Sequence, residues 1–144
     1  MRVSRALALF LALVLAFMAA APALAQTTAQ DAELRPTPAY FAQAVFDLSM
    51  AQALARSCST ISVDPVKSAA RAEDLLTELA EDGFDTGAPH EQMADPNAAI
   101  AALQTEFAAE YDLQSPSEEE VCGIAGEEMA AASGIGALLV EVAE

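Results

Sequence analysis

The sequence predicts an all-α domain, a small bundle of four to five helices held by one disulfide. Alanine and other strong helix formers dominate the chain after its first 25 residues. Apolar residues recur there at three- and four-residue spacing between helix start and stop signals, and no segment alternates as a half-buried strand does. The chain also holds 2 cysteines, the even number that a disulfide requires.

The first 25 residues have the three parts of a secretory signal peptide, so residues 1–25 are predicted to be removed. Arg2 and Arg5 give the positive start, and an apolar run over residues 6–21 precedes the cleavage pattern Ala23-Leu24-Ala25. The alternative is an uncleaved anchor, but the run is shorter than the roughly 20 apolar residues of a membrane-spanning helix. We therefore expect a periplasmic or secreted product with no stable membrane insertion after cleavage.

The chain after residue 25 is strongly acidic. It carries 4 basic and 22 acidic residues, so its net charge is 4 − 22 = −18. A surface of this sign repels nucleic acid and anionic membranes, so neither is an expected partner. The charge suits a cationic partner, although a solvated acidic surface with no further role is the simpler explanation.

A polar leader and one long helix are predicted at the start of this part. Residues 26–38 lack periodicity and include Pro36 and Pro38, which predicts a flexible leader. The acidic helical domain is expected over residues 39–144, and its first helix over residues 39–57. The apolar stripe of that helix consists of Phe41, Ala44, Val45, Leu48, Ala51 and Ala55.

The second helix has clear signals at both ends. After a loop over residues 59–63, Asp64-Pro65 places an aspartate cap before a proline that has no N–H to leave unpaired. Gly83 ends the helix, and we expect Phe84 to fold back against it in a Schellman-type turn.

Two further helices and a short last one complete the bundle. Asp95-Pro96 repeats the start signal, and Ser117 with Glu120 forms a capping box for a fourth helix. Ser133-Gly134 interrupts that helix, and a last short helix is expected over residues 135–142. The inward stripe of the third helix consists of Ile100, Leu103, Phe107 and Tyr111.

Cys58 and Cys122 are predicted to form the disulfide, because an even cysteine count in an exported chain indicates one. The bridge would close a loop of 64 residues and stabilise the fold by on the order of 4 kcal/mol. The alternative is a reactive thiol at Cys122, since a helix N-terminus favours thiolate formation. The negative charge of residues 118–120 opposes that reading, and the chain has no C-x-x-C pair.

We find no catalytic, cofactor-binding or metal-binding constellation in the sequence, so an enzyme is not expected. His90 is the one histidine and lies beside Glu91 without zinc-ligand spacing. The acidic stretch at 81–87 fails the EF-hand register, because apolar residues take ligand positions. Gly134-Ile135-Gly136 lacks the strand and third glycine of a dinucleotide-binding loop, and such glycines more often permit close backbone packing.

Four motifs follow one another along the chain, and their order resembles a known family. They are Cys58-Ser59-Thr60-Ile61, Gly83-Phe84, Glu120-Val121-Cys122 with Gly126, and the ending Ser133-Gly134-Ile135-Gly136-Ala137-Leu138-Leu139. Over about 45–139 the chain resembles an alphaproteobacterial family of short exported helical proteins with two cysteines, a domain of unknown function. The resemblance implies export, a helical fold and pairing of the cysteines, and it supplies no catalytic residue.

Two functions are weighed from the sequence. The first is a non-enzymatic binding or envelope-associated protein with an unknown protein partner, which predicts an exposed apolar patch or groove between helices, rimmed by acids. The second is a small-ligand or cation-binding helical module. An enzyme is the weakest alternative, and it would require His90 near paired carboxylates in a cleft. A ligand pocket could use the aromatics Tyr40, Phe41, Phe46, Phe107 and Tyr111, although these also suit helix packing.

Overall fold

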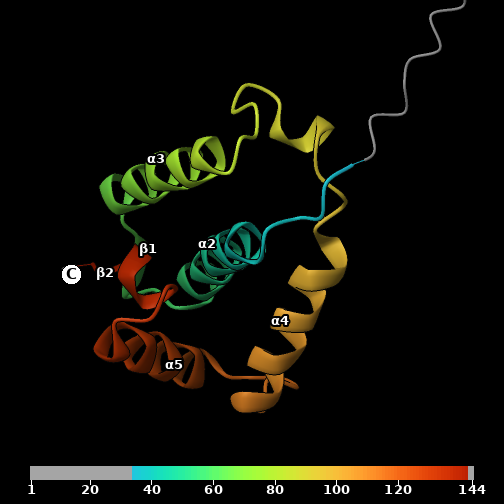
Figure 1. The fold of residues 1–144 in the computed structure, drawn as a ribbon. Coiled ribbons are helices and arrows are strands. Elements are labelled where there is room, and N and C mark those ends of the chain that lie inside the picture. The colour runs from blue at the N-terminus through green and yellow to red at the C-terminus, as the bar shows by residue number, and fades with distance from the viewer. Residues whose placement is uncertain (1–33, 143–144) are drawn as a thin grey trace, which may run out of the picture. The chain divides into compact units, whose positions relative to one another are not determined.

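The structure is a computed structural model that describes residues 34–142. The predicted signal peptide and residues 26–33 of the predicted leader lie outside the described residues. The elements follow in the order α2 (Ala39–Ser57), β1 (Ile61–Val63), α3 (Pro65–Glu81), η1 (Pro89–Glu91), α4 (Asn97–Glu110), α5 (Glu118–Ala131), η2 (Gly136–Leu138) and β2 (Leu139–Glu141) (Figure 1).

The four α-helices of the described part confirm the predicted all-α class, with one small sheet added. Helix α2 lies in the middle, in contact with α3, α4 and α5 (Figure 1). Its bounds agree with the predicted range of 39–57, but its buried residues do not follow the single apolar stripe that was predicted. Because neighbours cover this helix on several sides, its buried residues are Ala42, Ala44, Phe46, Asp47, Ala51 and Leu54.

The main hydrophobic core lies between α2, α4, α5 and the chain end at η2 and β2. Phe107 of α4 packs edge-on against Phe46 at 6.0 Å between ring centroids, and against Tyr111 at 4.9 Å. Ile100 and Leu103 also pack against this core, which confirms the predicted inward stripe of the third helix.

Helix α3 has the predicted caps at both ends. The Asp64 carboxylate accepts hydrogen bonds from the backbone N–H groups of Val66 and Lys67 at 2.9 and 3.2 Å. At the other end Gly83 has φ +77°, and Phe84 N–H donates to the Leu79 carbonyl at 2.9 Å. The positive φ of Gly83 and the bond from Phe84 to Leu79 form the predicted Schellman-type turn.

The capping box of α5 is also confirmed. Ser117 N–H donates to the Glu120 carboxylate at 2.7 Å, and Glu120 N–H donates back to Ser117 Oγ at 3.3 Å. The two reciprocal bonds satisfy backbone donors that have no partner inside the helix.

The prediction of a loop at 59–63 and a last helix over residues 135–142 was wrong. β1 and β2 pair antiparallel, with Ser62 opposite Val140, and among the residues described after α5 only the short η2 turn is helical. Each strand has three residues, too few for an alternating pattern to show in the sequence. The pairing also joins distant parts of the chain, so local propensity gives no sign of it.

The predicted disulfide between Cys58 and Cys122 is present, with 5.1 Å between the Cα atoms. It joins the end of α2 to the first turn of α5. Beside it, the Glu118 carboxylate accepts from the N–H and the hydroxyl of Ser59 at 3.1 and 2.7 Å. The covalent and hydrogen-bonded links hold the β1 side of the fold onto α5.

Residues 34–38 are held against the loop before α4. Arg35 N–H donates to the Gln92 carbonyl, and Ala94 N–H donates to the Arg35 carbonyl, both at 2.8 Å. The Arg35 guanidinium also lies 3.7 Å from the centroid of the Phe84 ring, an attractive cation–π arrangement. The described end of the predicted leader is therefore part of the folded domain.

Candidate functional site

The sequence candidate His90 lies in η1, at the edge of an open cleft of about 380 Å³. One carboxylate, that of Asp95, is among the residues that line this cleft with His90. The lining of this cleft therefore lacks the paired carboxylates that catalysis by His90 would require. Within residues 34–142, no three His, Cys, Asp or Glu side chains are grouped to hold a metal ion.

The five aromatics suggested for a ligand pocket are divided among different places. Phe46 and Phe107 belong to the main core, while Tyr111 and Phe41 line separate cavities. Tyr40 donates to the Asp82 carboxylate at 2.7 Å, and burial together with this bond raises the pKa of Tyr40 to about 12. Their main role in the fold is packing.

Two carboxylates that the sequence analysis did not single out are buried, Asp47 of α2 at 9% exposure and Glu128 of α5 at 8%. Asp47 accepts from Gln43 Nε2 at 2.8 Å. Glu128 accepts from the Tyr111 hydroxyl at 2.7 Å and from the Ser133 hydroxyl. Buried polar groups need such partners. The Asp47 bond lies within α2, whereas the Tyr111–Glu128 bond joins the end of α4 to α5.

The electrostatics of the buried carboxylates follow from their surroundings. Burial raises the pKa of Asp47, and the negative charge of Glu128 adds to this, whereas Gln43 and Arg71 act in the opposite direction. The bond to Glu128 likewise raises the pKa of Tyr111, because losing the hydroxyl proton would place two negative charges together.

The glycines of the C-terminal motif allow the chain to pass close to these carboxylates. A Cβ on Gly134 would lie 2.6 Å from Asp47 Cγ, and a Cβ on Gly136 would lie 2.6 Å from the backbone nitrogen of Met129. The predicted role of these glycines in close packing is confirmed. The close approach of these glycines therefore covers Asp47 and the backbone of Glu128.

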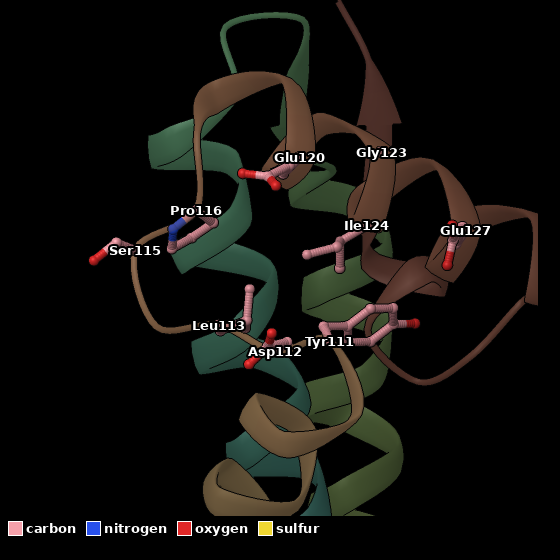
Figure 2. A pocket seen from close by; sticks show the side chains of 9 residues that line it. All are labelled: Tyr111, Asp112, Leu113, Ser115, Pro116, Glu120, Gly123, Ile124 and Glu127. Atoms are coloured by element: carbon pink, nitrogen blue, oxygen red, sulfur yellow. The ribbon is translucent and has the colours of Figure 1, made fainter.

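An acidic pocket of about 340 Å³ lies between the end of α4 and α5 (Figure 2). Leu113 and Ile124 point into it, and Gly123 leaves its α5 wall open (Figure 2). Its titratable lining residues are Tyr111, Asp112, Glu120 and Glu127, with no basic residue among the lining. Such a pocket offers an apolar floor and negative charge at its rim.

A second, smaller cavity separates α2 from α3, and we call it the α2–α3 groove. Its volume is about 80 Å³, and it is lined by Ala44, Val45, Leu48, Ser68, Arg71, Ala72, Leu75 and Leu138. Leu48 of α2 is 37% exposed, and Leu76 of α3, which directly follows the lining residue Leu75, is 44% exposed. The groove is thus an apolar opening beside two exposed leucines.

Only one of the 17 residues of α3 is buried, namely Leu79. Leu79 packs with Phe84 and Met93 at one end of the helix. At the other end Asp64 N–H donates to the Leu138 carbonyl at 2.8 Å. Between these two points the apolar face of α3 lies over the groove, and Leu75 of that face packs against the Leu79 cluster.

The two polar side chains of the groove are Ser68 and Arg71 of α3. Among the residues described, Ser68 Oγ is the only buried side-chain oxygen or nitrogen that lacks a hydrogen-bond partner. The Arg71 guanidinium has one carboxylate partner, Glu78, at 3.5 Å. The sequence showed Ser68 only as one helix position among others, because its burial depends on how α3 lies on α2.

Comparison with known proteins gives a family without an activity. The model of a family of unknown function (DUF5333) matches residues 34–140, and the chain belongs to this family. This confirms the resemblance at the level of a domain of unknown function, over a range that contains the whole groove. No curated protein and no solved structure matches the chain.

Proposed function

We propose that this member of the DUF5333 family is an exported, non-enzymatic protein that binds a partner protein at the α2–α3 groove. The single observation that carries the proposal is an amphipathic helix with one buried residue, Leu79, lying over an unfilled apolar groove. Burying one leucine side chain is favourable by about 1.5–3 kcal/mol. Leu48 and Leu76 are exposed in the free protein, so their burial against a partner would contribute this free energy to binding.

The charge of the chain indicates what kind of partner fits. After residue 25 the net charge is 4 − 22 = −18, so a second copy of the chain is repelled. A partner with basic residues is attracted at long range, and this attraction raises its association rate. We therefore propose a basic protein segment that places an apolar side chain in the groove.

Export is the second part of the proposal. The signal-peptide pattern of residues 1–25 supports it, and disulfides such as Cys58–Cys122 persist in oxidising compartments. None of the helices in residues 34–142 is long and apolar enough to cross a membrane. Cleavage after Ala25 leaves Gln26 as the first residue of the exported protein.

Mass spectrometry of the protein purified from its native host tests the export proposal. We expect a chain that starts at Gln26 and carries no reactive thiol after denaturation without reductant. A cytoplasmic chain that retains Met1 and reacts at Cys58 and Cys122 with a thiol reagent would refute export.

Site-specific photo-crosslinking in the cell tests binding at the groove. A small diazirine-bearing residue is placed at Leu76, beside the groove, and in a control variant at Ala70, an exposed position on the opposite side of α3. We expect a discrete adduct from position 76 and none from position 70. Adding Ala72→Phe, which fills the groove, should remove the adduct at position 76.

The same experiment can defeat the proposal. Equal adducts from both positions, or an adduct at position 76 that persists with Ala72→Phe, would show that the groove is not what the partner contacts. Circular dichroism of each variant confirms that the helices are intact, so a lost adduct reports on the groove.

A second candidate function is the binding of a small cationic ligand, supported by the size and lining of the acidic pocket. Its apolar floor and its carboxylates at Asp112 and Glu127 suit an organic amine. Calorimetry with spermidine and with calcium tests it. Spermidine should bind the native protein and bind Asp112→Asn/Glu127→Gln more weakly, while Glu119→Gln, outside the pocket, should leave binding unchanged. Absence of heat with both probes would dismiss this function.

A further inference from the structure

The Cys58–Cys122 disulfide links two segments that are 64 residues apart in the chain. Cys58 is 1% exposed, belongs to the main core and ends α2, shortly before β1. Cys122 lies near the start of α5. The bridge therefore fixes the end of α2 and the beginning of β1 against α5.

The noncovalent links at the same end of the fold are short or exposed. The sheet of β1 and β2 has three residues in each strand, and a two-stranded sheet of that size is marginally stable in water. The bonds from Ser59 to Glu118 are exposed to solvent, so water competes with them. Ile61 and Leu139 add buried apolar contacts. Without the bridge, the sheet depends on these weak bonds and two buried side chains.

Three other features lower the stability that the bridge supplements. Asp47 and Glu128 are buried carboxylates, and among residues 34–142 no basic side chain forms an ion pair with either. Helix α3 contributes one buried residue, Leu79. The net charge of 4 − 22 = −18 after residue 25 disfavours the compact state through repulsion among like charges. We therefore expect the fold without its disulfide to have little stability of its own.

Loop closure sets the size of the effect. Closing a loop of 64 residues shifts the ratio of folded to unfolded chain by roughly a thousandfold, equivalent to about 4 kcal/mol. Small secreted domains that lose a native disulfide often no longer fold at 37 °C. Thiols stay reduced in the cytoplasm, where the chain is made, so the precursor lacks this contribution there.

The signal pattern matches a chain that crosses the membrane before it folds. Its two arginines, Arg2 and Arg5, are separated by two residues, whereas the export route for folded proteins reads adjacent arginines. A precursor on the other route has to remain extended until it has crossed. Early folding of residues 34–142 would therefore block export.

We infer that the disulfide is a redox switch for folding, which leaves the reduced precursor unfolded and lets the exported chain fold once Cys58 and Cys122 are oxidised. The inference rests on the export part of the proposed function. In the oxidation, the two thiols form the S–S bond and pass two electrons and two protons to a disulfide oxidant, which is released as two thiols. The α2–α3 groove then exists only after export, because α3 follows β1 directly.

Refolding under two redox conditions tests the switch. The exported protein, purified from its host, is reduced in urea and diluted at 37 °C into buffer with either dithiothreitol or a mixture of oxidised and reduced glutathione. We expect helical circular dichroism to return only in the glutathione buffer, and digestion by proteinase K to be at least about a hundredfold slower there than in dithiothreitol. The full precursor, synthesised in a reducing extract, should be digested as fast as the reduced protein.

Two variants separate the bridge from its neighbours. Cys58→Ala/Cys122→Ala keeps position 58 apolar and cannot form the bridge, so it should behave as the reduced protein does in both buffers. Ser59→Ala loses one exposed hydroxyl bond to Glu118 and keeps the bridge. It should refold in the glutathione buffer as the native chain does.

The outcomes separate this inference from the function it rests on. A reduced protein or a double variant that is as helical and as resistant to digestion as the oxidised protein would overturn the switch. Export would then still stand on the mass of a chain that begins at Gln26. If instead the chain in its host retains Met1, export fails as a proposal and the switch falls with it, whatever the refolding result is.

Discussion

Asp47 makes the stability of the fold depend on pH. Burial and the nearby Glu128 raise its pKa above the ordinary value of about 3.9, against the opposing effects of Gln43 and Arg71. The folded state thus binds the proton more tightly than the unfolded chain does. The resulting penalty is absent below the ordinary pKa and grows as the pH rises through the folded pKa.

Asp47→Asn is therefore expected to raise the free energy of unfolding more near neutral pH than near pH 3. Asparagine keeps an oxygen that accepts from Gln43 but carries no buried charge. Urea unfolding of both proteins from about pH 3 to pH 8 measures the difference in unfolding free energy. A difference that stays constant over this range would mean that Asp47 titrates as an exposed aspartate does.

Gly136 of η2 and Gly126 of α5 should respond oppositely to alanine. Gly136→Ala is expected to destabilise by about 1–3 kcal/mol, because its Cβ meets backbone atoms of Glu128 and Met129, which cannot move aside. Gly126→Ala, inside α5 with open space around it, should stabilise by about 1 kcal/mol through helix propensity. Denaturant midpoints decide this, and a neutral Gly136→Ala would contradict the close approach.

Most start and end signals of the helices were predictable because they act locally. Asp95-Pro96 is an exception, because Pro96 itself is the N-cap of α4 and Asp95, one residue earlier, is not the cap. Asp64-Pro65, Gly83 and the Ser117–Glu120 pair each satisfy backbone groups within a few residues. The strand pair and the burial of Asp47 depend on segments far apart in the chain, so nothing local indicated them. An apolar patch or groove rimmed by acids was expected without a position, and the α2–α3 groove has no acidic residue among its lining. Its position depends on the distance between α2 and α3, which nothing local indicates.

Helix α3 should be the least protected helix of those described. It is fixed at its two ends, and its middle covers an unfilled groove. Local opening of such a helix requires less free energy than opening the buried α2. Hydrogen exchange should therefore be faster for amides near 69–76 than for amides near 44–54. Equal protection of the two segments would show that α3 is packed as firmly as α2.

The disulfide acts on the molecule as a whole by closing the chain between α2 and α5. Replacing both cysteines, in Cys58→Ser/Cys122→Ser, should lower the unfolding free energy by up to about 4 kcal/mol, since the loop contains 64 residues. The double variant leaves no free thiol. A thermal midpoint equal to that of the native protein would show that the core and the Ser59–Glu118 bonds suffice.

The whole-molecule account depends on an α2–α3 groove that is open in the free protein. The two variants Ala72→Phe and Ala70→Phe share the same loss of helix propensity, but only position 72 lines the groove. Their difference in unfolding free energy therefore reports on the groove alone. Its sign separates an open groove from a closed core, in which extra volume destabilises by about 1–3 kcal/mol.

The most direct test of the central claim is this difference, measured by urea unfolding at neutral pH. We predict that Ala72→Phe is more stable than Ala70→Phe by at least about 1 kcal/mol, because the ring buries apolar area in the groove. An Ala72→Phe protein that is less stable than Ala70→Phe would contradict the claim, since it would show a groove already filled by its own side chains.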